Sequence, residues 1–474
     1  MLKMYQEESK LHQNTFIHQD DERDSPFAFA GNKLYFVSLG CPRNLVDTEV
    51  MLGLLLKEGY EPAETLEESD FIIINTCGFL DESRRESLDT IGHCLEQRKE
   101  GAKVIVTGCM VQSHSKIIEE HYSTIDFLLG SGDVEKILEA VRSTEKGASI
   151  TTAKSYLEAG EVPRQLSTPS HYAYLKIAEG CRKRCSYCII PDIKGPLKSK
   201  SIERVLREFR VLRDQGVKEI ILIAQDLGDW GKDLGYRNST GLVQLLREIL
   251  KEEGDFWLRL LYLYPDEITD ELIALMQQDD RICPYLDMPI QHINNTLLKS
   301  MRRATSREHI LETIHKLKEK IPDIVIRTSL IVGFPGETED QFKELCSFVS
   351  EGLIDNIGVF QYSREPGSHA DSLTGHLSES VKEKRYHKLM KIQQKVVSKG
   401  LRRLIGKQFK VIVEGYHQET DLLMRARFSG QCPEIDGSII INDGRIVDAF
   451  GEWYMAEVTD VAGYDLVAKI TKKL

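Results

Sequence analysis

The sequence lacks the features that mark an exported or membrane-spanning protein. No window of its 474 residues approaches the roughly 18 consecutive apolar residues that a membrane span needs. Its polar N-terminus has neither the positive start nor the apolar stretch of a signal peptide. We therefore expect a cytoplasmic protein in which the ten cysteines are reduced thiols.

Two further absences restrict the function. The chain contains no GxxxxGK(S/T) phosphate loop. Its net charge is -12, whereas a protein that grips nucleic-acid phosphates usually carries a basic field. The charge favours a basic protein partner or a small substrate, and it leaves room for a local basic patch that contacts RNA.

The length predicts several domains. Residues 1–32 are polar and mixed in charge, which predicts a mobile N-terminal extension. Residues 33–150 alternate strand and helix patterns, with strands expected at 33–39, 71–74 and 103–107, and so predict an open parallel α/β domain. Residues 151–170 carry Gly, Pro, Ser and Thr without periodicity, which is typical of a linker.

The second half of the chain predicts two more domains. Residues 171–403 contain six βα units, which indicate a partial (βα)6 barrel. Its strands are expected at 173–177, 220–223, 257–263, 285–288, 324–330 and 356–360. Residues 404–474 change to short β-rich runs, typical of a small antiparallel β-barrel of the oligonucleotide-binding (OB-like) kind.

Three cysteines have a spacing that chance rarely produces. Cys181, Cys185 and Cys188 follow the first predicted barrel strand, on the face where barrel active sites lie. Three thiolates can bind three irons of a cubane cluster and leave the fourth iron open. A structural zinc site is the alternative, but zinc favours paired Cys-x2-Cys knuckles, and no second knuckle occurs. The basic residues 182–184 are expected to form a solvated loop face.

This motif resembles the signature of the radical S-adenosylmethionine (SAM) superfamily. Tyr187 stands where that superfamily carries an aromatic residue, and Ile189-Ile190-Pro191 extends the similarity. The resemblance implies a [4Fe-4S] cluster whose open iron chelates SAM, so that reduction releases a 5′-deoxyadenosyl radical. Tyr187 is therefore a candidate SAM-binding residue, and so is Gln225, which ends the second predicted barrel strand on the active face.

Three other cysteines share a placement in the first domain. Cys41, Cys77 and Cys109 each follow a predicted strand, and the ends of parallel strands form the edge where ligands bind. Each has an adjacent glycine, which would let the backbone approach a bulky ligand: Gly40, Gly78 and Gly108. Because unrelated core cysteines are not expected to repeat this placement, we predict a second cluster. The remaining cysteines are predicted to be ordinary residues: Cys94, Cys283, Cys346 and Cys432.

The order of these domains resembles the methylthiotransferases over about residues 33–474. The resemblance implies two [4Fe-4S] clusters, with SAM as both radical source and methyl donor, and a terminal barrel of the TRAM type. It further implies that the deoxyadenosyl radical takes a hydrogen from an unactivated carbon. That carbon then captures a methylated sulfur at the second cluster.

Members of this family modify either an adenosine of tRNA or the β-carbon of an aspartate in ribosomal protein uS12. Three stretches here resemble the uS12 branch: Ser38-Leu39-Gly40-Cys41-Pro42-Arg43-Asn44-Leu45-Val46-Asp47, the stretch from Trp257 to Pro265 and the stretch from Tyr285 to Ile293. Charge is an independent test, since a barrel that grips tRNA should be basic. Residues 407–474 contain 8 Lys and Arg against 11 Asp and Glu, a net charge of -3.

We therefore expect uS12, free or in the small ribosomal subunit, as the partner. A flavodoxin- or ferredoxin-like electron donor is also expected, and neither tRNA nor a membrane is. Two alternatives stay open. A tRNA methylthiotransferase would leave a methylthio group on an adenosine, and a non-catalytic, metal-stabilised ribosome-binding protein would form no deoxyadenosine from SAM.

Overall fold

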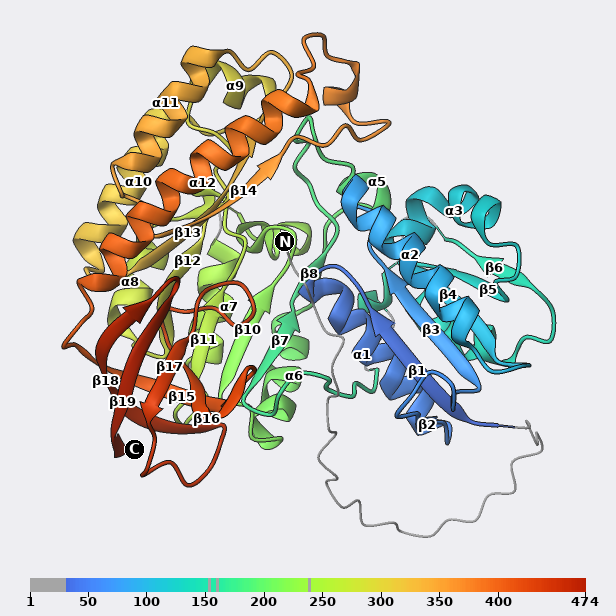
Figure 1. Cartoon of the computed structure of the whole chain (residues 1–474). Helices are drawn as coiled ribbons and strands as arrows, with labels where there is room; N and C mark the ends of the chain where they lie inside the picture. The colour runs from blue at the N-terminus through green and yellow to red at the C-terminus, as the bar shows by residue number, and fades with distance from the viewer. Residues whose placement is uncertain (1–30, 152–154, 159–161, 238–239) are drawn as a thin grey trace.

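The structure is a computed structural model that describes residues 31–151, 155–158, 162–237 and 240–474. The predicted extension at 1–32 lies almost wholly outside these residues, as do 152–154 and 159–161 of the predicted linker. Figure 1 shows an α/β unit, a central partial barrel and a small closed barrel along one chain. The predicted fold class is confirmed, whereas the predicted domain limits stay a prediction.

The N-terminal unit is a six-stranded parallel sheet in the order β2-β1-β3-β4-β5-β6. Its central strand β3 is buried along its whole length, because helices cover both faces of the sheet. The sequence predicted three of the six strands and missed the short β2, β5 and β6. The elements are β1 (Lys33–Ser38), α1 (Pro42–Lys57), β2 (Glu61–Pro62), β3 (Phe71–Thr76), α2 (Asp81–Gln97), β4 (Lys103–Gly108), α3 (Cys109–His121), β5 (Phe127–Gly130), α4 (Ile137–Arg142) and β6 (Gly147–Ser149).

The central unit is an open parallel sheet in the order β14-β13-β12-β11-β10-β7, with a small antiparallel pair, β8 and β9, beside it. All six predicted barrel strands are present. The strands are β7 (Tyr172–Lys176), β8 (Ala178–Glu179), β9 (Lys198–Ser199), β10 (Glu219–Ile223), β11 (Trp257–Leu260), β12 (Ile282–Asp287), β13 (Val325–Val332) and β14 (Asn356–Gln361). The helices are α5 (Ile190–Lys194), α6 (Ile202–Asp214), α7 (Thr240–Ile249), α8 (Asp270–Gln278), α9 (Asn295–Ser300), α10 (Arg307–Lys320), α11 (Glu339–Ser350) and α12 (Glu379–Arg402).

The C-terminal unit is a closed barrel in the order β15-β16-β17-β19-β18. Its strands are β15 (Gln408–His417), β16 (Thr420–Phe428), β17 (Ile439–Asp443), β18 (Glu452–Ala462) and β19 (Asp465–Lys473). Four strand pairs are antiparallel, as predicted, but β17 and β19 run parallel. A closed ring of five strands cannot alternate direction at every pair, so one parallel pair is a geometric necessity.

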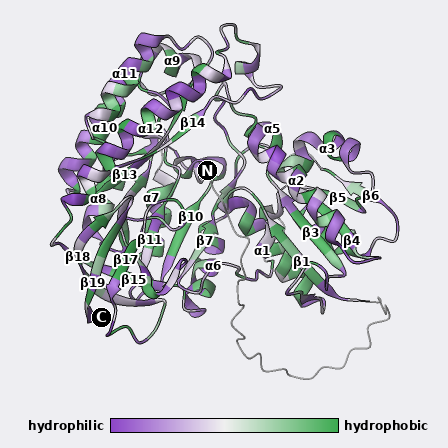
Figure 2. Ribbon diagram, viewed as in Figure 1, coloured by the Kyte–Doolittle hydropathy of each residue, from purple (hydrophilic) through white to green (hydrophobic). Residues whose placement is uncertain are grey.

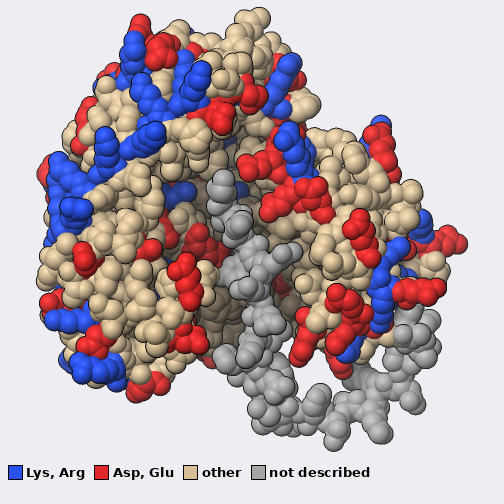
Figure 3. All heavy atoms as spheres, viewed as in Figure 1, with Lys and Arg blue, Asp and Glu red and all other residues tan. Residues whose placement is uncertain are grey.

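Polarity follows the layers. Figure 2 shows hydrophobic strands inside and mixed or hydrophilic helices around them. Figure 3 shows Lys and Arg side chains gathered over α10, α11 and α12, and α12 presents five exposed lysines on one side: Lys384, Lys388, Lys391, Lys395 and Lys399. The net charge of -12 therefore coexists with a local basic face. Among the described residues, no helix is both long enough and apolar enough to cross a membrane.

Candidate functional site

Cys181, Cys185 and Cys188 lie in the loop between β8 and α5, after the first barrel strand. The loop is held by its own backbone, since the N–H of Cys188 donates to the carbonyl of Cys185 at 3.1 Å. The N–H of Ile190 points at the Sγ of Cys188 at 3.5 Å. A backbone donor aimed at sulfur favours the thiolate, which is the form that binds a metal.

Two side chains from other parts of the barrel cover Cys185. The Tyr264 hydroxyl lies 3.4 Å from its Sγ, and Arg303 Nη1 lies 3.8 Å from the same atom. Arg303 stacks on the Tyr264 ring at 3.7 Å and donates to the carbonyl of Pro289 at 2.5 Å. This buried guanidinium places positive charge beside a candidate ligand. Nothing in the sequence motif indicated it.

The thiols of this loop are weak acids without a metal. Burial raises the pKa of Cys181 to about 11 and the pKa of Cys188 to about 12. Both therefore carry a proton at neutral pH, and a bound metal has to displace it. All ten cysteines lie within the described part of the chain and none is in a disulfide.

The second set of cysteines meets at one edge of the N-terminal sheet. Register pairs Ser38 of β1 with Asn75 of β3, and Thr76 of β3 with Gly108 of β4. The three strands therefore end at the same level. Cys41, Cys77 and Cys109 follow these ends, as the sequence predicted.

Asn44 ties these strand ends together. Its Nδ2 donates to the carbonyls of Leu39 and Thr76, each at 3.1 Å. Its Oδ1 accepts from the Sγ of Cys109 at 3.5 Å. One side chain of α1 thus fixes the loops that carry all three cysteines.

The adjacent glycines also lie close to neighbouring protein. A Cβ added at Gly40 would lie 2.8 Å from the Cβ of Cys77, and one at Gly108 would lie 2.3 Å from the Oδ1 of Asn75. These glycines therefore leave room for neighbouring protein, and their approach to a ligand stays a prediction. Their effect is to let the three loops approach one another.

Electrostatics differ among these thiols. Burial opposes ionisation of Cys41, but Arg43 and the N–H of Asn44 outweigh it and lower the pKa of that thiol. Burial raises the pKa of Cys109 to about 12, against the nearby charge of Lys194. Cys41, at the N-terminal cap of α1, is therefore the most readily ionised of the set.

The two sets of cysteines face each other across the contact between the first two units. Cys109 packs directly against Ile189, which precedes α5, and against Ile193, which lies in α5. Arg43 donates to the carbonyl of Ala224 at 3.1 Å, just past the end of β10. The structure thus brings together two motifs that are separated by more than 70 residues of sequence.

The two candidate SAM contacts are placed differently. The Oε1 of Gln225 is buried at the barrel mouth and has no hydrogen-bond partner among the described residues. Such an orphaned acceptor implies a missing donor, and the ammonium of an amino acid ligand is one. Tyr187 instead packs beside Met301, Phe334 and Tyr362.

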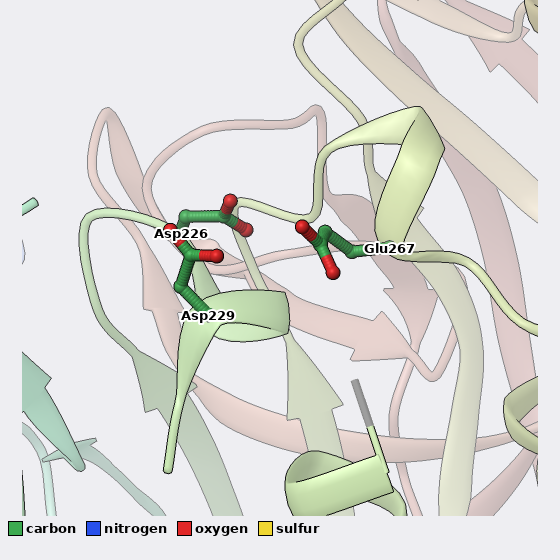
Figure 4. Close-up of side chains that lie close together, drawn as sticks. All are labelled: Asp226, Asp229 and Glu267. Carbon is green, nitrogen blue, oxygen red and sulfur yellow. The ribbon is translucent and has the colours of Figure 1, made fainter. Parts of the chain in front are cut away.

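A buried acidic group adjoins Gln225. Figure 4 shows Asp226, Asp229 and Glu267, whose oxygens lie within 4.8 Å of one another. Lys183 Nζ lies 2.8 Å from Glu267, and Lys232 Nζ lies 2.7 Å from both Asp229 and Glu267. Two ammonium groups therefore already offset most of the charge of the three carboxylates, and the group is an ion-pair network.

This network corrects one prediction. The loop 182–184 was expected to be solvated throughout, and Arg182 and Arg184 are exposed, but Lys183 turns inward. Burial raises the pKa of Asp226 to about 7, and Asp229 adds to the effect against the charge of Lys183. The only sequence signal for the network is that Asp226 follows Gln225.

Spacing also bears on the choice of metal. Within the described chain, the acidic group of Figure 4 is the sole set of three or more potential ligand atoms within 4.8 Å. Zn–S bonds of about 2.3 Å would hold tetrahedral sulfurs about 3.8 Å apart. In the described chain, neither cysteine set brings its three sulfurs that close together. The sulfurs of each set therefore lie farther apart than a zinc ion would hold them.

Family models match three parts of the chain. They are described as Uncharacterized protein family UPF0004 at residues 33–130, Radical SAM superfamily at residues 175–349 and TRAM domain at residues 405–471. A solved structure with a similar fold is the radical S-adenosylmethionine methyltransferase TsrM from Kitasatospora setae. It has a TM-score of 0.53 and 16% identity, with 72% of this chain and 77% of that chain covered.

Curated relatives are far more similar in sequence, and each is named ribosomal protein uS12 methylthiotransferase RimO. The protein from Protochlamydia amoebophila is 64% identical, with 97% of this chain and 98% of the relative covered. That from Chlamydia caviae is 55% identical over 94% and 97%, and that from Bdellovibrio bacteriovorus is 41% identical over 92% and 97%. The predicted resemblance is confirmed: the chain belongs to the ribosomal protein uS12 methylthiotransferase family of radical SAM enzymes.

Proposed function

We propose that this enzyme attaches a methylthio group to the β-carbon of an aspartate in ribosomal protein uS12. The observation that carries the proposal is the facing arrangement of two cysteine sets, one at a radical SAM barrel and one at a separate sheet edge. The names of the relatives support uS12 as the substrate.

Cys181, Cys185 and Cys188 would hold one [4Fe-4S] cluster through three thiolates, which leaves an open iron for SAM. The residues fit, because the three thiols are free, partly or fully buried and lie beside Arg303 and a backbone donor. Cys41, Cys77 and Cys109 would hold a second [4Fe-4S] cluster at the sheet edge.

When bound, these groups supply a 5′-deoxyadenosyl radical that breaks a C–H bond, a sulfur for the new C–S bond and, from a second SAM, a methyl group. The chain itself positions them. Gln225 offers its unpaired acceptor to the SAM ammonium, while Tyr187 supports the cluster loop. The half-buried Tyr264 covers Cys185 and limits the access of water to the cluster loop, which protects a radical.

The partners follow from this chemistry. A flavodoxin- or ferredoxin-like protein would deliver the electron. The enzyme would bind uS12 in the cytoplasm, either as the free protein or in the small ribosomal subunit. The tRNA alternative is not favoured, since the relatives are named for uS12 and the terminal barrel has a net charge of -3.

Iron analysis after replacement of each cysteine set tests the two clusters. The reconstituted wild-type protein should hold about eight irons, and serine replacement of either set should leave about four. Cys346→Ala is the matched control, because that buried cysteine lies on α11 and faces Lys388 and Glu339. If replacement of Cys41, Cys77 and Cys109 leaves the iron content unchanged, the assignment of a second cluster to these cysteines is wrong.

Mass spectrometry of uS12 tests the reaction. Incubation with the enzyme, SAM and a reductant should add one methylthio group to a single aspartate, and neither cysteine variant should do so. An unmodified uS12, or a methylthio group on tRNA adenosine instead, would contradict the proposal.

A further inference from the structure

Arg43 occupies the contact between the two cysteine sets. It is the second residue of α1, directly after Pro42, and its side chain crosses to the central barrel. Nη1 donates to the carbonyl of Ala224 at 3.1 Å, and the guanidinium lies 5.1 Å from the centre of the Tyr262 ring. Arg43 therefore lies where a substrate must reach both sites.

Its charge acts on sulfurs of both sets. Arg43 faces the thiols of Cys41 and Cys109 on its own side, and its charge also reaches Cys188 in the barrel loop. These are the positions from which a radical and a sulfur would have to meet at one carbon.

Arg43 has no carboxylate partner among the described residues. Arg327, whose charge also acts on Tyr262, is by contrast paired with Asp287 at 2.7 Å. The half-buried guanidinium of Arg43 also contacts the thiol of Cys41, but no carboxylate of the described chain balances its charge. A guanidinium has five N–H donors in a fork that matches a carboxylate; the Ala224 carbonyl and the Cys41 thiol accept from Arg43, which leaves further donors for a carboxylate.

Tyr262 helps to hold this fork in place. Its backbone lies in the left-handed region, with φ 64°, and its carbonyl accepts from the N–H of Leu227 at 3.0 Å. A bulky residue adopts that conformation only where its surroundings impose it, and such strain gathers at binding sites. The ring of this residue is the one over which the Arg43 guanidinium lies.

We propose that Arg43 binds the side-chain carboxylate of the target aspartate and so holds its β-carbon between the two cysteine sets. The inference rests on the proposed function, because only that function supplies an aspartate. A carboxylate is one bond from the β-carbon, so this contact fixes the reacting atom within a short radius. Arg43 would thus make the site specific for an acidic side chain.

The test compares uS12 with a variant in which the modified aspartate is changed to asparagine. Binding of each to the reconstituted, unreduced enzyme is measured by titration calorimetry, where no turnover occurs. The wild-type enzyme should bind the aspartate form about tenfold more tightly, as loss of a charge-assisted contact implies. Equal binding of the two forms overturns the inference without any enzyme variant.

Enzyme variants assign the preference to Arg43. Arg43→Met keeps the length of the side chain and should bind both forms equally, whereas Arg43→Lys should retain part of the preference. Arg213→Met is the matched control, since Arg213 also bonds backbone carbonyls and lies 5.3 Å from an aromatic ring, Phe256. It should keep the full preference.

The outcomes separate this inference from the proposed function. If the wild-type enzyme does not modify uS12 at all, the proposed function fails. If it modifies uS12 but Arg43→Met still prefers the aspartate form tenfold, only the inference fails. A change in the electron paramagnetic resonance of the reduced clusters in Arg43→Met, with the preference intact, would show that Arg43 serves the clusters alone and also overturns it.

Discussion

At the scale of single residues, burial changes the acid–base behaviour of Asp226. Its carboxyl lies among Asp229, Glu267 and two lysines, and burial raises its pKa to about 7. The folded protein therefore takes up a proton at a pH where the unfolded chain has lost it. Stability from this group is fully present below about pH 4 and is lost as the pH rises through about 7.

Asp226→Asn tests this behaviour. One pKa unit corresponds to about 1.4 kcal/mol, so the variant should be at least about 1 kcal/mol more stable, relative to wild type, at pH 7.5 than at pH 5. Urea unfolding of the metal-free protein at the two pH values measures the difference. Glu319→Gln, at an exposed carboxylate, should show none. A constant difference across pH would contradict the raised pKa.

At the scale of elements, the ends of parallel strands bring distant cysteines together. β1, β3 and β4 end level with one another, and glycines beside the cysteines let their loops touch. The sequence predicted this meeting from strand patterns alone, because parallel strands share their C-terminal edge. It could not predict the close approach of Gly40 to Cys77, which depends on how the loops turn after the strands.

Gly40→Ala tests the close approach. Gly40 has φ +94°, and a Cβ there would press against Cys77 at 2.8 Å. Gly59 has φ +87° with nothing within 4 Å, so Gly59→Ala isolates backbone strain from crowding. Both variants should lose about 1 kcal/mol of stability. Only in Gly40→Ala should the iron content of the reconstituted protein also decrease, from about eight irons toward about four. Full iron content in Gly40→Ala would refute the crowding argument.

At the scale of the whole molecule, a buried ion chain joins the terminal barrel to the central one. Glu219 of β10 pairs with Arg259 at 2.5 Å and with Arg427 of β16 at 2.7 Å. Arg427 continues to Glu414 at 2.6 Å, and Glu414 to His171 at 3.1 Å. Each of these side chains is at most 4% exposed. This buried network of ion pairs therefore fixes how the terminal barrel sits against the central one.

Glu219→Gln should destabilise this junction by about 3 kcal/mol, because it leaves buried arginines without their counter-charge. Trp257 and Trp453 meet at the same junction, with ring centres 4.6 Å apart, so tryptophan fluorescence during urea unfolding reports on it. Asp255→Asn breaks an exposed pair with Lys410 between the same units and should cost less than about 1 kcal/mol. Equal losses in the two variants would mean that burial does not matter here.

The sequence by itself determined the order of the three folds and the placement of both cysteine sets. Each depends on local patterns: hydrophobic alternation, strand ends and motif spacing. These patterns are encoded within a few residues, and the rules that convert them into a sheet edge or a barrel mouth are general.

Only the tertiary structure decided which other side chains complete the site. Arg43 reaches Ala224 across 181 positions, Arg303 reaches Cys185 across 118, and Lys183 reaches Glu267 across 84. No periodicity marks these residues, because their partners lie on other elements. Their roles arise from the packing of the first unit against the barrel, where burial removes water and makes each charge depend on its neighbours.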